Sequence, residues 1–195
     1  MCERLIMSRF SEGDGDWDNA WMWEGWRNSA LSGKRTHAEL VGFLAHLDSM
    51  PIKRIGASAF ITKEGDYCTV AEYCRFKGLA QEKLEHYKKL SYGYIDEEID
   101  ESENGWDLGP TVQAGHEAGL PKVIAYELGS YNDLNADCKW IETEGPINSF
   151  YQHSHLVRIE LTPEERWIKV RNHIASLVAE GKKLQARKQR KLVKV

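Results

Sequence analysis

The stretch LTPEERWIKVRNHIASLV, residues 161–178, carries the clearest folding signal in the sequence. Thr162, Pro163 and Glu165 together mark a helix start, with a hydroxyl cap, a proline at the first helical position and a glutamate that completes a capping box. Apolar residues then recur at helical spacing, at Trp167, Val170, Ile174, Leu177 and Val178. The pattern predicts an amphipathic helix whose apolar stripe packs on the core of the protein.

Two more helices are expected near the start of the chain. Residues 17–31 carry tryptophans over a wide arc, and Gly33 is expected to end this segment. Thr36 with Glu39 three residues later is a second capping box, and apolar residues at helical spacing follow until Pro51. The sequence therefore predicts a tryptophan-rich helix and then an amphipathic one.

The middle of the chain predicts four shorter helices. One follows Cys68, and the next covers residues 79–90. Two more lie within residues 111–131, on either side of a break at Gly119. The stretch SYND, residues 130–133, predicts a turn after the last of them.

Three segments predict β-strands because they are short and rich in branched and aromatic residues, namely 57–62, 138–143 and 150–160. With 195 residues and 42% hydrophobic composition, the chain is long enough to bury one core. We therefore expect a single α+β domain over residues 1–181, helix-rich with a small antiparallel sheet. A tail over residues 182–195 follows it.

The tail is strongly basic, although the whole chain carries a net charge of −4. It holds seven basic residues and no acid, whereas the preceding 181 residues have a net charge of −11. The basic residues of the tail are Lys182, Lys183, Arg187, Lys188, Arg190, Lys191 and Lys194. They could bind the phosphates of DNA or RNA, and because the tail has no aromatic residue, contact would be to the backbone. A solubilising helix extension, or a tail that folds back on an acidic run, is an open alternative.

That acidic run places six acids within residues 96–103 and no basic residue among them. Such a run is typical of a solvated segment, because like charges repel and nothing apolar holds it. A calcium loop needs ligands at fixed offsets, and the segment from Asp96 to Asp107 does not keep them. An acidic surface that mimics a nucleic-acid backbone is a further alternative.

Cys68 lies at the expected start of a short helix, where the helix dipole favours a thiolate. His116 and then Asp133 or Asn132 follow in a chain order that suits the base and the orienting group of a thiol hydrolase. The alternative is that Cys68 is a small buried side chain. The four cysteines are scattered and form no CxxC pair, so neither a zinc ribbon nor a disulfide framework is expected.

His153 and His155 would point to the same side of a strand and could share a metal ion. Cys138 or Asp137 could supply a third ligand, while two exposed histidines on an edge strand explain the pattern without a metal. The sequence has no glycine-rich phosphate loop, no GxSxG and no Walker lysine. Nucleotide hydrolysis is therefore disfavoured, and no cofactor is expected.

No stretch of the sequence approaches the roughly 18 apolar residues of a membrane-spanning helix. The N-terminal apolar stretch is also too short for a secretion signal. We therefore expect a cytoplasmic protein.

Three segments in a fixed order give the chain a family resemblance: GDYCTVAEYCRFKG (65–78), GLPKVIAYELGSYND (119–133) and the opening stretch at 161–178. In these it resembles a loose set of small phage and prophage proteins. Those proteins often carry Cys-x-x-Gly, whereas here Cys68 is followed by no such glycine. The resemblance implies a phage or prophage origin, and it implies no chemistry.

The function expected from these features is that of a non-enzymatic phage or prophage accessory protein in the host-cell cytoplasm. It would bind a host protein or nucleic acid, with the basic tail as the contact. The alternative is a thiol-dependent hydrolase that uses Cys68 and His116.

Overall fold

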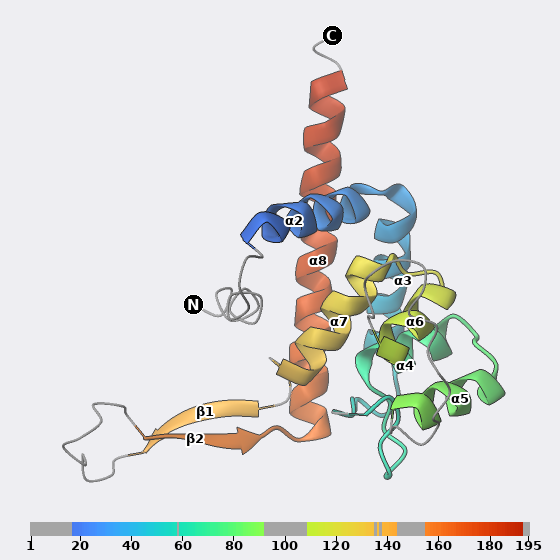
Figure 1. Cartoon of the computed structure of the whole chain (residues 1–195), viewed down its shortest axis with the longest axis vertical. Helices are drawn as coiled ribbons and strands as arrows, with labels where there is room; N and C mark the ends of the chain where they lie inside the picture. Colours follow the sequence, from blue (N-terminus) through green and yellow to red (C-terminus); the bar gives the residue numbers. More distant parts are fainter. Residues whose placement is uncertain are drawn as a thin grey trace.

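One long helix, α8 (Pro163–Leu192), organises the molecule. The structure is a computed structural model that describes residues 17–57, 59–91, 109–134, 136, 138–143 and 155–192. In Figure 1, α8 runs along the longest axis, and a crossing helix and a group of shorter helices lie against it.

The start of α8 has the predicted capping box. The backbone N–H of Glu165 donates to Thr162 Oγ1 at 3.2 Å, and the N–H of Thr162 donates to Glu165 Oε2 at 2.9 Å. The predicted apolar stripe is buried at Trp167, Val170, Ile174 and Leu177. This part of the fold is confirmed, and the helix continues through Gly181, where the tail was expected to begin, as far as Leu192.

Helices α2 (Trp17–Ser32) and α3 (Lys34–Ser49) confirm the two helices expected at the start of the chain. The helix cap expected at Thr36 is wrong, because α3 begins earlier, with Gly33 as its N-cap and no side-chain cap. Backbone hydrogen bonds from Gly33 N to Ala30 O and from His37 N to Gly33 O close the junction directly. Thr36 is therefore buried inside the first turn of α3.

Four short helices confirm the pattern of the middle segments. They are α4 (Thr69–Phe76), α5 (Gln81–Ser91), α6 (Gly109–Glu117) and α7 (Lys122–Leu134). Gly119 has a φ of 104°, which lets the chain reverse between α6 and α7.

The turn expected at SYND is wrong, because these residues continue α7. Asn132 is buried there, accepts a hydrogen bond from Thr69 Oγ1 at 2.9 Å and donates one to Gly56 O at 3.1 Å. These tertiary contacts hold the segment helical despite its turn-forming residues.

The α+β fold class is wrong: the described chain is mostly helical. Strands β1 (Cys138–Thr143) and β2 (His155–Glu160) pair with each other in an antiparallel hairpin and with no other described segment. Figure 1 shows this hairpin projecting from one end of α8. The described residues therefore contain no sheet within the helical core.

The strand expected at 57–62 does not form in the described part of that segment, which leaves out residue 58. Ile61 and Tyr67 make an isolated bridge, and Thr62 N donates to Asp66 O across a tight turn in which Gly65 has a φ of 86°. The segment pairs with the residues that follow it, and the adjacent Ile55 N donates to Pro163 O. It is consequently a loop packed on α8 rather than a sheet strand.

Within the described residues, no helix combines the length and the apolar character needed to cross a membrane.

Candidate functional site

The basic C-terminal part of α8 begins where this helix crosses the junction of α2 and α3. A Cβ atom at Gly181 would lie 2.8 Å from Leu31 O and 3.2 Å from His37 Nδ1. Only a glycine allows so close an approach between the helices. Beyond the crossing, α8 extends past the rest of the described fold (Figure 1).

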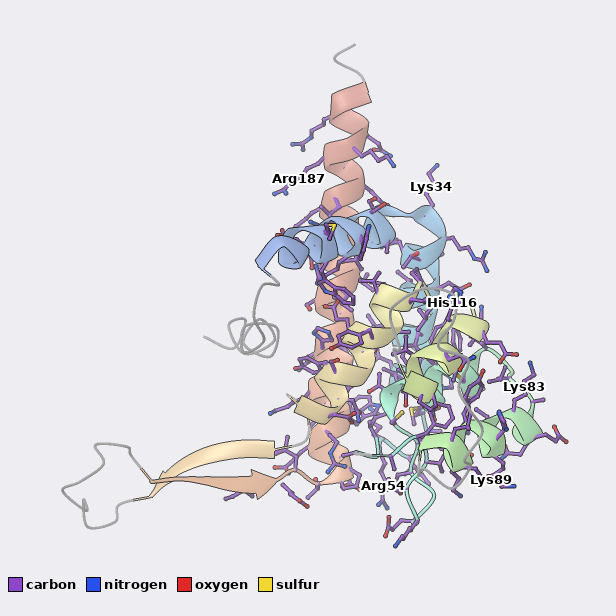
Figure 2. The ribbon with its side chains drawn as sticks, in the orientation of Figure 1. Lys34, Arg54, Lys83, Lys89, His116 and Arg187 are labelled. Carbon is purple, nitrogen blue, oxygen red and sulfur yellow. The ribbon has the colours of Figure 1, made fainter. Side chains whose placement is uncertain are left out.

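We call residues 182–192 the basic arm. Its exposed cationic side chains are Lys182, Lys183, Arg187, Lys188 and Arg190. Figure 2 shows Arg187 reaching out from the side of α8 just beyond α2. Of the other two predicted binding residues, Lys191 is helical but its side chain is not described, and Lys194 lies outside the described residues.

The five exposed cations of the basic arm form no ion pair with any carboxylate in the described part of the chain. The acidic run at 96–103, onto which the tail was expected to fold as an alternative, lies outside the described residues. The arm thus presents its charge to solvent along the described helix.

A groove of about 620 Å³ lies between the basic arm and α2. From α2 its wall consists of Gly25, Asn28, Ser29 and Ser32. From the arm its wall consists of Leu184, Arg187, Lys188 and Arg190. The groove is open to solvent, and no acidic residue lines it.

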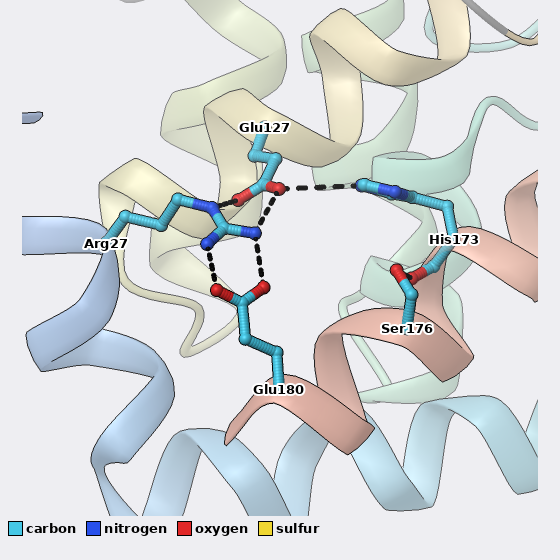
Figure 3. A network of polar contacts seen from close by, with 5 residues as sticks. All are labelled: Arg27, Glu127, His173, Ser176 and Glu180. Carbon is cyan, nitrogen blue, oxygen red and sulfur yellow. Dashed lines mark hydrogen bonds and ion pairs between the residues drawn. The ribbon is translucent and has the colours of Figure 1, made fainter. Parts of the chain in front are cut away.

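A polar network beneath this groove fixes α2 against α7 and α8 (Figure 3). Arg27 donates to both carboxylate oxygens of Glu127, at 2.8 and 3.0 Å, and to both of Glu180, at 2.7 and 2.9 Å. The Glu127 side chain is only 8% exposed. One guanidinium therefore joins three helices through two bidentate pairs, the geometry in which arginine binds carboxylates best.

The charges in this network are shaped by burial. Burial would lower the pKa of Arg27, but the hydrogen bonds to Glu180 and Glu127 outweigh it and raise that pKa. Burial raises the pKa of Glu127, and the hydrogen bond and charge of Arg27 oppose that shift. The hydrogen bond from Arg27 lowers the pKa of Glu180.

His173 completes the network as a neutral group. Burial, followed by the charge of Arg27, lowers the pKa of His173 to about 4. Its Nε2 lies 3.6 Å from Glu127 Oε1 and has no hydrogen-bond partner among the described residues. At neutral pH this contact is accordingly not an ion pair.

Cys68 lies at the start of α4, as predicted, where it is the N-cap residue, but its environment suppresses the thiolate. The residue is 4% exposed, and Sγ accepts a hydrogen bond from Ala71 N at 3.4 Å. Burial raises the pKa of Cys68 to about 12, and the hydrogen bond from Ala71 only partly offsets it. This geometry favours the structural role for the thiol.

Among the described residues, neither His116 nor Asn132 forms a hydrogen bond with Cys68, and the charge of Asp133 adds to burial in raising the pKa of that thiol. His116 lies at the end of α6, and its Nδ1 is 3.1 Å from Leu120 O. The side chain of Asn132 accepts a hydrogen bond from the Thr69 hydroxyl and donates hydrogen bonds to Gly56 O and, at 3.0 Å, to Asp133 Oδ1.

The predicted metal site cannot be placed. His153 and Asp137 lie outside the described residues, and the side chains of His155 and Cys138 are not described. Elsewhere in the described chain, no cluster of three or more His, Cys, Asp or Glu side chains could hold a metal ion.

Sequence reasoning identified the cations of the basic arm and missed the α2 wall and the network. Arg27 is separated from Glu127 by 100 residues and from Glu180 by 153. The one local signal is the position of Arg27, a charged residue that shares a helix face with the apolar Trp23 and Leu31 at helical spacing.

Comparison with protein-family models, with curated proteins and with solved structures finds no match for this chain.

Proposed function

We propose that the protein binds nucleic acid through the basic arm, without catalysing a reaction. The observation that carries the proposal is the set of five exposed cations on a helix that extends past the fold and has no carboxylate partner among the described residues. A rigid row of unpaired cations is suited to the regularly spaced phosphates of a polynucleotide.

The expected binding is independent of base sequence. Lysine and arginine neutralise phosphates and release condensed counterions, which gives an affinity that falls steeply as salt rises. The sequence of the arm contains no aromatic residue that could stack on bases. Contacts to the backbone therefore dominate.

We also propose an origin and a location for the protein. A phage or prophage accessory protein in the host-cell cytoplasm fits the expectations drawn from the sequence. The thiol-hydrolase alternative is disfavoured, because a buried Cys68 with a pKa of about 12 is a poor nucleophile near neutral pH.

The test compares two triple variants of the full chain. In the arm variant, Arg187, Lys188 and Arg190 are replaced by glutamine, which removes charge and keeps helix propensity. In the control variant, the exposed Lys63, Lys89 and Lys122 on other elements are replaced by glutamine. Both variants have the same net charge, so a difference between them reports position.

Fluorescence anisotropy with labelled single-stranded and duplex DNA and RNA then measures affinity at low salt. The arm variant is expected to bind roughly 30-fold more weakly than the natural chain, and the control only slightly more weakly. Equal losses in the two variants, or no binding by the natural chain, would overturn the proposal. The second result would direct attention to a host protein as the partner.

A further inference from the structure

We propose that the groove between α2 and the basic arm seats the sugar-phosphate backbone of a single-stranded nucleic acid. This inference rests on the proposed function and adds where the strand lies, which strand form is held and which residues of α2 take part.

The two walls of the groove offer complementary contacts to a phosphodiester. Arg187, Lys188 and Arg190 supply positive charge from the arm. Asn28 and Ser29 face them from α2, and in the described part of the chain neither side chain forms a hydrogen bond. An amide and a hydroxyl are common hydrogen-bonding partners of phosphate and sugar oxygens.

The absence of bulk and of negative charge along the lining favours close approach of a chain. Gly25 has no side chain, and a Cβ built there meets no atom within 4 Å. No acid lines the groove to repel a phosphate. A backbone can hence lie against α2 while its phosphates face the arm.

The size of the groove selects the form of the nucleic acid. Its volume of about 620 Å³ is that of a small-molecule site, which spans roughly 300 to 1,000 Å³. A duplex is stiff over about 150 base pairs and presents two strands together, so it can contact only the outer face of the arm. A flexible single strand can bend into the groove.

The network at Arg27 holds the groove in shape before any ligand arrives. Arg27 directly precedes Asn28 in α2, and its partner Glu180 lies one helical turn before Leu184 in α8. Both walls are thus fixed to each other by one bidentate ion pair. Such preorganisation lowers the ordering cost of binding.

The test places one negative charge on the α2 wall and leaves the arm intact. Ser29→Asp adds an acid inside the groove, and Asn172→Asp adds one at an exposed position in the middle of α8 as the matched control. The probes are a short oligothymidylate and a DNA hairpin duplex. Thermal melting confirms that both variants fold like the natural chain.

Ser29→Asp is expected to weaken oligothymidylate binding roughly fivefold relative to Asn172→Asp, and to change duplex binding no more than the control does. If both variants bind oligothymidylate equally well, or if Ser29→Asp weakens duplex binding just as much, the groove is not a single-strand seat. In both cases the natural chain still binds, so the proposed function stands. Failure of the natural chain to bind either probe would instead remove the proposed function itself, and this inference with it.

Discussion

The ring of His173 lies flat on the ring of Tyr131, with centroids 3.8 Å apart and planes 3° from parallel. Burial and then the charge of Arg27 lower the pKa of this ring, the charge of Glu180 opposes both, and Glu127 lies 3.6 Å away. Because the guanidinium already binds both carboxylates, a second positive charge would have no acceptor of its own here. The network is therefore built for a neutral imidazole.

This arrangement predicts acid sensitivity. The pKa of His173 is about 4 in the fold against 6.5 ordinarily, so between these values the unfolded chain binds a proton that the folded chain does not. Stability therefore falls as pH drops from about 7 to about 4, by a total of about 3 kcal/mol from this residue. Urea unfolding at a series of pH values measures the loss.

The control is His173→Phe, which keeps an aromatic ring on Tyr131 and removes the titration. As pH drops from about 7 to about 4, the unfolding free energy of the natural chain should fall by about 3 kcal/mol more than that of this variant. Titration of Glu180 and Glu127 is common to both proteins and largely cancels in the difference. Parallel pH profiles would contradict the neutral, buried state of His173.

Cys68 gives a second prediction at the scale of one residue. With its pKa raised to about 12 by burial, the thiol should resist iodoacetamide in the native protein near pH 8. In urea the same thiol should react as an ordinary cysteine. Mass mapping of the peptide that contains Cys68 distinguishes the two states, and fast native alkylation at Cys68 would restore the thiol-hydrolase hypothesis.

At the scale of elements, the crossing of α8 over the α2–α3 junction depends on one glycine. In most helix interiors, alanine in place of glycine stabilises by about 1 kcal/mol. At Gly181 the added Cβ would lie 2.8 Å from Leu31 O, a backbone atom that cannot easily move. Gly181→Ala should accordingly destabilise the protein by about 1 to 2 kcal/mol.

Gly25 in α2 is the matched position, because a Cβ there meets nothing within 4 Å. Gly25→Ala should stabilise the protein by about 1 kcal/mol, so the melting temperatures of the two variants should move in opposite directions. If both substitutions stabilise, the close crossing of α8 and α2 is not as described.

The elements that sequence predicted well are those whose signals are contiguous. The capping box at Thr162 and Glu165 needs only local residues, and it forms as expected. The one at Thr36 failed because Gly33 made the helix junction through its backbone instead. Likewise, residues 57–62 have the composition of a strand, but Ile61 pairs only with Tyr67 across the adjacent turn. The composition of a single segment does not indicate which segment it will pair with.

The candidate site likewise has one part that the sequence predicts and another that it does not. A run of lysines and arginines is visible in the sequence, so the basic arm could be predicted. The groove that the arm forms with Asn28 and Ser29 could not be predicted, because these two residues have no distinguishing pattern in the sequence and meet the arm only where α2 and α8 cross. The network of Arg27, Glu127 and Glu180 likewise exists only once three distant helices meet.

At the scale of the whole molecule, charge is separated along the chain. The first 181 residues have a net charge of −11, and the seven basic residues of the C-terminal segment follow them. An acidic body opposes nonspecific attraction between nucleic acid and the rest of the surface, so the proposed binding would be confined to the end of α8.

The most direct test of this account is the salt dependence of binding to a single-stranded oligonucleotide. The natural chain, the arm variant (Arg187, Lys188 and Arg190 to Gln) and the control variant (Lys63, Lys89 and Lys122 to Gln) are compared in a plot of log affinity against log salt. Each lost phosphate contact reduces the slope by about 0.7, so the arm variant should lose about 2 from its slope and the control almost nothing. Three indistinguishable slopes would contradict the claim that the basic arm is where this protein meets nucleic acid.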